Sequence, residues 1–130
     1  MRAVDPAEQQ RQLQLAFESY RQAYEQSGGY WTGINAATMA LLAGHKAVAT
    51  AVAREVRELC LRELAQVKEA GDDPYWLHAT LGEAALLLNS WAEAESWYAQ
   101  AAEAGRGRLG ELASTRRNAR LIIRALGGDE

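Results

Sequence analysis

The sequence predicts an all-α fold, a short solenoid built from antiparallel helical hairpins. Leu and Ala dominate its apolar residues, and no segment of the 130 residues shows the alternation of a half-buried strand. Glycines cluster between the apolar segments, as expected of short connections between helices. A stretch that opens on Tyr-Trp also recurs 45 residues later in the chain. Such a recurrence is typical of helical repeats.

Capping residues and glycines place the expected helices in order. Asp5 before Pro6 and Asp73 before Pro74 suit helix starts, where the missing N–H of proline costs little. The loops between the segments are short, so neighbouring helices are expected to be antiparallel. We expect one domain over residues 1–130. The expected helices span residues 6–27, 31–43, 46–70, 74–88, 91–104 and 108–126.

Two parts of the chain align as copies of one unit. Residues 30–44 match residues 75–89 in their Tyr-Trp opening, an alanine and a Leu-Leu pair. Residues 16–25 match residues 94–103 at two alanines, a tyrosine, a glutamine and a glutamate. The first helix therefore corresponds to the second half of a unit, and the last helix to the first half of another. The whole units are residues 30–70 and 74–104.

The second unit resembles the tetratricopeptide repeat. Leu81 and Gly82 lie in its first helix, and Ala94, Tyr98 and Ala101 lie in its second. Small residues at positions 82 and 94 let the two helices approach closely, and Tyr98 would fill the space beyond. The first unit departs from the usual period of about 34 residues, because its second helix is long.

A narrower resemblance covers about residues 8 to 126. The segments "GINAAT" (33–38) and "YWLHATLGEA" (75–84) are similar to the TRAF-binding domain. This tetratricopeptide-like module occurs in animal apoptosis signal-regulating kinases and in many bacterial proteins. The resemblance implies a sensor in stress or conflict signalling, which would respond to a nucleotide-derived signal.

The first helix of each unit carries a stripe of candidate ligand-binding residues. In such a stack the first helices line the concave face, and residues at offsets of four and seven share one stripe. Each stripe combines a tryptophan with hydrogen-bonding groups, which suits a planar ligand or a peptide. The stripes contain Trp31, Asn35 and Thr38 in the first unit, and Trp76, Thr80 and Glu83 in the second.

Structural roles are the alternative for these residues. Either tryptophan of the stripes can simply pack on the preceding helix, and Asn35 can bond a neighbouring backbone group. Gly33 marks either close packing or room for a ligand. Trp91 and Trp97 are expected in the core between repeats.

The last helix adds positive charge. Six arginines lie between residues 106 and 124, and several share one face opposite an apolar face. They form either a solvated end of the domain or an anion-binding rim, because guanidinium groups suit phosphate and carboxylate. Arg117 and Asn118 would close the far end of the site, with Ser114 nearby. The other basic residues of this region are Arg106, Arg108, Arg116, Arg120 and Arg124.

Several functions are not expected. The net charge of −3 argues against nucleic-acid binding, and no apolar run nears the ~18 residues of a membrane helix. Cys60 stands alone, so it is expected as a buried thiol in a reducing, cytoplasmic setting. His45 and His78 match no metal-ligand pattern, and Asp72–Asp73 resembles a helix cap. Without a phosphate loop or nucleophile motif, we expect no catalysis, metal or cofactor.

The sequence therefore predicts a non-catalytic binding or sensor module of a signalling or conflict system. Its ligand would be small and anionic, such as a nucleotide derivative, and would bind on the concave face. The alternative is a scaffold that binds a peptide, a partner protein or a fused effector domain in the same groove. A closed pocket around Trp31 and Trp76 would favour the first hypothesis, and an open groove the second.

Overall fold

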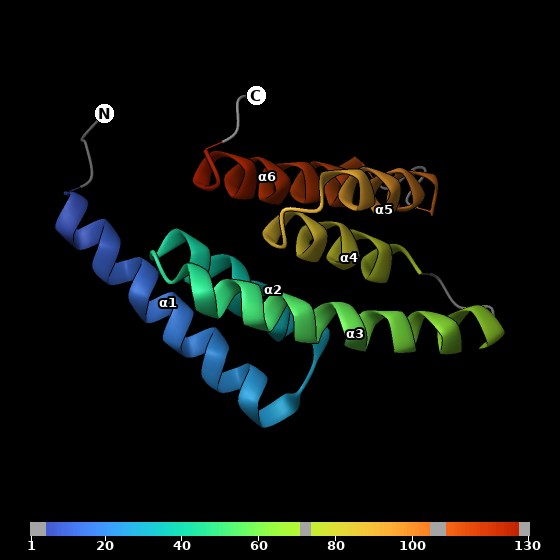
Figure 1. Ribbon diagram of the computed structural model, residues 1–130, viewed down its shortest axis with the longest axis horizontal. Coiled ribbons are helices and arrows are strands. Elements are labelled where there is room, and N and C mark those ends of the chain that lie inside the picture. The colour runs from blue at the N-terminus through green and yellow to red at the C-terminus, as the bar shows by residue number, and fades with distance from the viewer. Residues whose placement is uncertain (1–4, 71–73, 105–108, 128–130) are drawn as a thin grey trace.

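The computed structural model describes residues 5–70, 74–104 and 109–127, with only the backbone for residues 68–70 and 109–112. These residues form six α-helices and no strand, joined by short connections (Figure 1). The predicted all-α fold is confirmed, and every helix ends within one residue of its expected bounds. The helices are α1 (Pro6–Ser27), α2 (Tyr30–Leu42), α3 (Lys46–Ala70), α4 (Tyr75–Leu87), α5 (Trp91–Ala104) and α6 (Leu109–Ala125).

Local signals set both ends of α1. Asp5 accepts a hydrogen bond from the amide of Ala7 at 3.2 Å, and Pro6 follows it, so the predicted cap is confirmed. The helix ends at Gly28, whose φ of 65° is a left-handed conformation that favours glycine. The second predicted cap, Asp72–Asp73 before α4, lies outside the described residues.

The helices form an inner and an outer layer. Helices α2, α4 and α6 contact one another, while α1, α3 and α5 pack outside them (Figure 1). The contact between α2 and α6 encloses α4, which lies between them in the chain. Every residue of α4 is therefore buried except Trp76. The expected concave face is therefore largely filled by this packing of the inner helices.

Two glycines allow close helix crossings. A Cβ atom at Gly82 would lie 2.8 Å from the ring of Tyr98 on α5, which confirms the predicted crossing and its aromatic filler. A Cβ atom at Gly33 would lie 2.6 Å from Val56 and 2.8 Å from Tyr24. Gly33 therefore serves close packing of α2 against α1 and α3, and it does not clear space for a ligand.

Trp91 and Trp97 take different positions from each other. Trp91 is 45% exposed, so its predicted place in the core is wrong. It begins α5, and its indole N–H donates to Asn89 in the preceding turn at 2.6 Å, which holds the ring outside the core. Trp97 is half-buried, packs on the core and stacks on His78 with ring centroids 5.7 Å apart.

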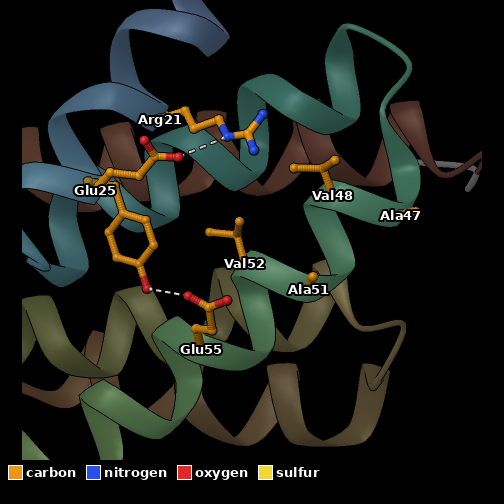
Figure 2. Close-up of a pocket in the computed structure, with 8 residues that line it drawn as sticks. Arg21, Glu25, Ala47, Val48, Ala51, Val52 and Glu55 are labelled. Carbon is orange, nitrogen blue, oxygen red and sulfur yellow. Dashed lines mark hydrogen bonds and ion pairs between the residues drawn. The ribbon is translucent and has the colours of Figure 1, made fainter.

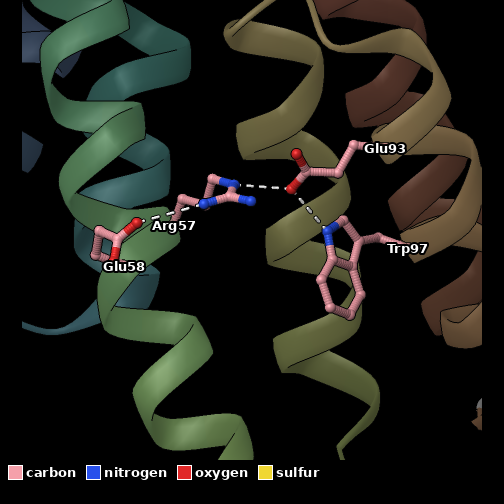
Figure 3. A network of polar contacts seen from close by, with 4 residues as sticks. All are labelled: Arg57, Glu58, Glu93 and Trp97. Atoms are coloured by element: carbon pink, nitrogen blue, oxygen red, sulfur yellow. Dashed lines mark hydrogen bonds and ion pairs between the residues drawn. The ribbon is translucent and has the colours of Figure 1, made fainter.

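A polar network joins the outer helices α3 and α5. Glu93 of α5 accepts from the guanidinium of Arg57 on α3 at 2.8 Å and from the indole N–H of Trp97 at 3.0 Å (Figure 3). These bonds lower the pKa of Glu93, with Arg57 as the largest cause. The side chains are partly solvated, so the ion pair contributes at most about 1 kcal/mol.

The lone cysteine is inert. Cys60 is fully buried in α3 and free, as predicted, and burial raises the pKa of its thiol to about 12. Among the described helices, none is both long enough and apolar enough to cross a membrane.

Candidate functional site

A small cleft lies where α2, α4 and α6 meet. Its volume is about 150 Å³, and all three inner helices line it. Trp31 and Trp76 form its rim, because their side chains are 60% and 44% exposed while most of the lining is buried. The lining residues are Trp31, Ile34, Asn35, Trp76, Ala79, Thr80, Glu83, Ser114, Thr115 and Asn118.

Helical spacing explains how each helix contributes to the cleft. Trp31 and Asn35 lie one turn apart on α2, as do Trp76 and Thr80 on α4, with Glu83 one turn further. On α6, Ser114 and Asn118 are also four residues apart. Each helix thus presents a single stripe to the cleft.

Tyrosine rings support both rim tryptophans. Trp31 packs edge-on against Tyr20 of α1, with ring centroids 6.0 Å apart. Trp76 packs edge-on against Tyr75, with centroids 4.9 Å apart. Such contacts favour one orientation of each indole, and a large part of both tryptophans stays exposed at the rim.

Glu83 is the one ionisable residue among the residues that line the cleft in the described structure. Its side chain is 8% exposed, and it accepts a hydrogen bond from Asn118 Nδ2 at 3.3 Å. Burial raises the pKa of Glu83 to about 7, and the bond from Asn118 opposes this rise only in part. The carboxyl group can therefore be charged or neutral near neutral pH, depending on what it contacts.

Both asparagines of the cleft donate to the protein itself. Asn35 Nδ2 donates to the backbone carbonyl of Trp31 at 2.8 Å, so the backbone bond expected as one alternative is confirmed. Asn118 Nδ2 donates to Glu83. The side-chain carbonyl oxygens of both asparagines remain as acceptors. Together with the carboxyl of Glu83, they make the cleft rich in acceptors.

A buried hydrogen bond holds α6 against α4 beside the cleft. The hydroxyls of Tyr75 and Thr115 lie 2.7 Å apart, and Tyr75 is fully buried. On the other side of α4, burial and the charge of Glu83 raise the pKa of Tyr98. The hydroxyl of Tyr98 is buried without a hydrogen bond in the described structure. The surroundings of Glu83 are thus buried on the α5 side and open only towards the cleft.

The structure brings most, but not all, of the predicted site residues to this cleft. Trp31, Asn35, Trp76, Thr80, Glu83 and Asn118 line it. Thr38 is buried at 5% exposure and does not line it, because it lies a turn further into the core of α2. Arg117 is exposed on α6 and also lies outside the lining, since a helix turns about 100° from Asn118 to its neighbour.

The remaining arginines lie elsewhere on α6. Arg120 and Arg124 are exposed, and Arg106 and Arg108 lie outside the described residues. Sequence reasoning missed Ile34, Ala79 and Thr115 as lining residues. Their spacing was the available signal, because Ile34 and Ala79 follow the rim tryptophans by three residues and Thr115 precedes Asn118 by three.

Larger grooves run between the outer helices. The groove between α1 and α3 has a volume of about 520 Å³, and valines and alanines of α3 make up half of its lining residues (Figure 2). Its polar side chains bond each other, Arg21 with Glu25 at 3.2 Å and Tyr24 with Glu55 at 3.0 Å. This groove therefore offers few convergent polar groups to a ligand.

A groove of about 490 Å³ lies between α3 and α5, where Arg57 and Glu93 already pair. A third, of about 300 Å³, lies between α5 and α6 and is mainly apolar. The described residues hold no group of His, Cys, Asp or Glu that could bind a metal ion. His45 bonds Gln14 at 2.6 Å, and His78 is buried against Trp97.

The fold and site define a tetratricopeptide-like helical repeat with a polar cleft between its inner helices. Residues 1–40 match the model of the Tetratricopeptide Repeats-Sensor family, which covers α1 and most of α2. The match indicates a repeat module of the sensor type. Searches of curated proteins and of solved structures found no match. The resemblance to the TRAF-binding domain of kinases stays a prediction.

Proposed function

We propose that the chain is a non-catalytic sensor module that binds a small, nucleotide-derived ligand at the cleft between α2, α4 and α6. The observation that carries this proposal is the cleft itself, where two exposed tryptophans stand over a buried carboxyl and two amides. Aromatic faces with a few polar groups are how proteins commonly orient a planar ligand. The match to a sensor family supports the same class of function.

The size of the cleft limits what can enter it. Its volume of about 150 Å³ is below the ~300–1,000 Å³ of pockets that enclose a whole drug-sized ligand. Only a ring or part of one fits inside, so the rest of the ligand lies outside the rim. Arg117 follows Ser114 by three residues on α6, so its exposed side chain begins beside the cleft and can meet an external phosphate.

The alternative is a protein scaffold that binds a peptide or partner domain along the inner face. Such a groove would have to remain open, whereas α2 and α6 contact each other across α4. This contact favours the small ligand. The exposed rim tryptophans could still contribute to a protein interface, which the experiment below separates from ligand binding.

Titration of the protein with nucleotides, dinucleotides and ADP-ribose-like compounds, followed by calorimetry, tests the proposal. We expect at least one compound to bind, and Trp31→Ala to weaken its affinity by about 1–3 kcal/mol through lost stacking. Trp91→Ala is the matched control, because Trp91 is similarly exposed but lies outside the cleft. No binding by the panel, with capture of a partner protein that depends on Trp31, would contradict the sensor proposal and favour the scaffold.

A further inference from the structure

The carboxyl of Glu83 is the one group in the lining of the cleft that can only accept hydrogen bonds once it is ionised, and the carbonyl oxygens of Asn35 and Asn118 lie in the same cleft. Each asparagine Nδ2 makes one bond within the protein and keeps a second N–H, while the hydroxyls of Thr80 and Ser114 can donate or accept. None of the residues that line the cleft in the described structure is basic. On α6, the exposed Arg117 follows Ser114 of the cleft by three residues, whereas Arg116 and Arg120 line the groove between α5 and α6.

This order constrains the two ends of a ligand. The part of the ligand that faces Glu83 must bring hydrogen-bond donors, because an acceptor there would meet the oxygens of an ionised carboxylate. The end that stays outside is favoured when it is anionic, because arginines suit phosphate. The rim tryptophans, Trp31 and Trp76, favour a flat ring between the two ends.

We propose that the cleft selects a guanine-type ring, with the carboxylate of Glu83 accepting from the adjacent ring N–H and amino group of its donor edge. This inference rests on the proposed function and adds the identity of the ring. A carboxylate has two oxygens, so it can accept from two neighbouring donors in the way that it pairs with a guanidinium group. An adenine ring presents an acceptor beside its amino group and would leave an oxygen of Glu83 facing a lone pair.

A cation such as an arginine side chain also carries paired donors. It has no anionic end for the exposed Arg117 of α6. A ring with a phosphate at its other end satisfies both regions at once. The charge arrangement therefore favours a guanine nucleotide over a free guanidinium group.

The first two probes are GMP and AMP, measured by calorimetry at pH 8. GMP should bind about tenfold or more tightly than AMP, because a charged hydrogen bond is at stake. IMP lacks the amino group of GMP and should lose a similar factor. Equal affinity for GMP and AMP would overturn the donor-edge inference while leaving a ring-binding cleft in place.

Glu83→Gln tests the residue, with Glu95→Gln as the control, since Glu95 is exposed on α5 away from the cleft. Glutamine presents one donor and one acceptor, so Glu83→Gln should weaken GMP about tenfold to a hundredfold and shift the preference towards AMP. If the role of Glu83 is purely structural, Glu83→Gln should weaken the binding of GMP, AMP and IMP by the same factor. That result would contradict the inference.

The pH dependence gives an independent readout. With a pKa of about 7, ionised Glu83 rises roughly tenfold from pH 6 to pH 8, so the affinity for GMP should rise by about the same factor. The groups facing Glu83 are Asn118 of α6, Asn35 of α2 across the cleft, and Tyr98 of α5, which titrates only at high pH. This rise in the affinity for GMP should vanish in Glu83→Gln. If it persists in that variant, ionisation of the GMP phosphate causes it and not Glu83.

Two further outcomes separate this inference from the proposed function. If no nucleotide of any kind perturbs Trp31 or Trp76, the sensor proposal fails together with the inference. If L-arginine amide binds and GMP does not, the acceptor-rich cleft serves a guanidinium group, and the inference about the ring is wrong.

Discussion

Helices α2 and α4 begin with the same Tyr-Trp pair, yet the structure uses them differently. Both place the tryptophan in solvent at the rim of the cleft. Tyr75 of α4 is fully buried and bonds Thr115 of α6, whereas Tyr30 of α2 is only half-buried. The difference follows from the neighbours of the two rings, because the hydroxyl of Tyr75 meets Thr115 of α6, whereas Tyr30 lies near Cys60 and Glu63 of α3.

The same comparison separates Thr38 from Glu83, which occupy equivalent positions seven residues after the tryptophan. Thr38 is buried away from the cleft, and Glu83 lines it. A carboxyl group at a buried position costs free energy that an uncharged residue would not. One unit therefore accepts a destabilising group that the other lacks, which is typical of a binding site.

Glu83 should give the largest effect on stability. The pKa of Glu83 is about 7 in the folded chain against an ordinary 4.5, so between these values the folded state holds a proton that the unfolded state releases. The free energy of unfolding therefore falls as pH rises from about 4.5 to about 7. The total loss is about 3 kcal/mol. Glu83→Gln should lack this loss, as judged from urea unfolding at pH 5 and pH 8.

Glu95→Gln is the control for that measurement, because it removes the same charge from an exposed position. Its stability should follow the pH dependence of the unmodified chain. If stability depends on pH in the same way in the unmodified chain and in Glu83→Gln, the carboxyl of Glu83 is well solvated. The second unit would then hold no buried charge that Thr38 of the first unit lacks.

Gly82→Ala should give a smaller loss, about 1–3 kcal/mol, because the new methyl group would lie only 2.8 Å from the ring of Tyr98. This loss would appear despite the better helix propensity of alanine. Gly33→Ala is the matched variant in α2, where the new methyl group would lie 2.6 Å from the fully buried Val56 and 2.8 Å from Tyr24, so its loss should be similar. If thermal unfolding finds that one of the two substitutions leaves stability unchanged, the helices do not cross closely at that glycine.

Tyr75→Phe should cost about 1–2 kcal/mol, since it leaves the buried hydroxyl of Thr115 without its partner. Tyr30→Phe should change stability by less than about 0.5 kcal/mol, because Tyr30 is half-buried. Denaturant midpoints of the two variants would test this directly. Equal losses would show that the two tyrosines are equivalent despite their different surroundings.

Much of the fold follows from local signals in the sequence. Asp5, Pro6 and the glycines set helix ends through capping and backbone freedom, so each helix could be placed to within a residue. The crossing at Gly82 was also predictable, since a glycine opposite an aromatic residue recurs in this type of repeat. These features depend on residues near each other in the chain or within one hairpin.

The site was predictable only in part. Helical offsets gave Trp31, Asn35, Trp76, Thr80 and Glu83, because one stripe faces one way. The contact between α2 and α6 depends on packing between distant segments, so the closing of the inner face and the burial of Glu83 had no local signal. The rotation of α6 about its axis was equally hidden, and it turns Asn118 into the cleft and Arg117 out of it.

The most direct test of the central claim is to follow the four indole N–H signals by NMR while GMP is added at pH 8. The account predicts that the signals of Trp31 and Trp76 shift together, and that Trp91 and Trp97, which lie outside the cleft, stay in place. Assignment by single substitution to phenylalanine identifies each signal. Shifts confined to Trp91 or Trp97, or no shift with any nucleotide of the panel, would contradict the placement of the site between α2, α4 and α6.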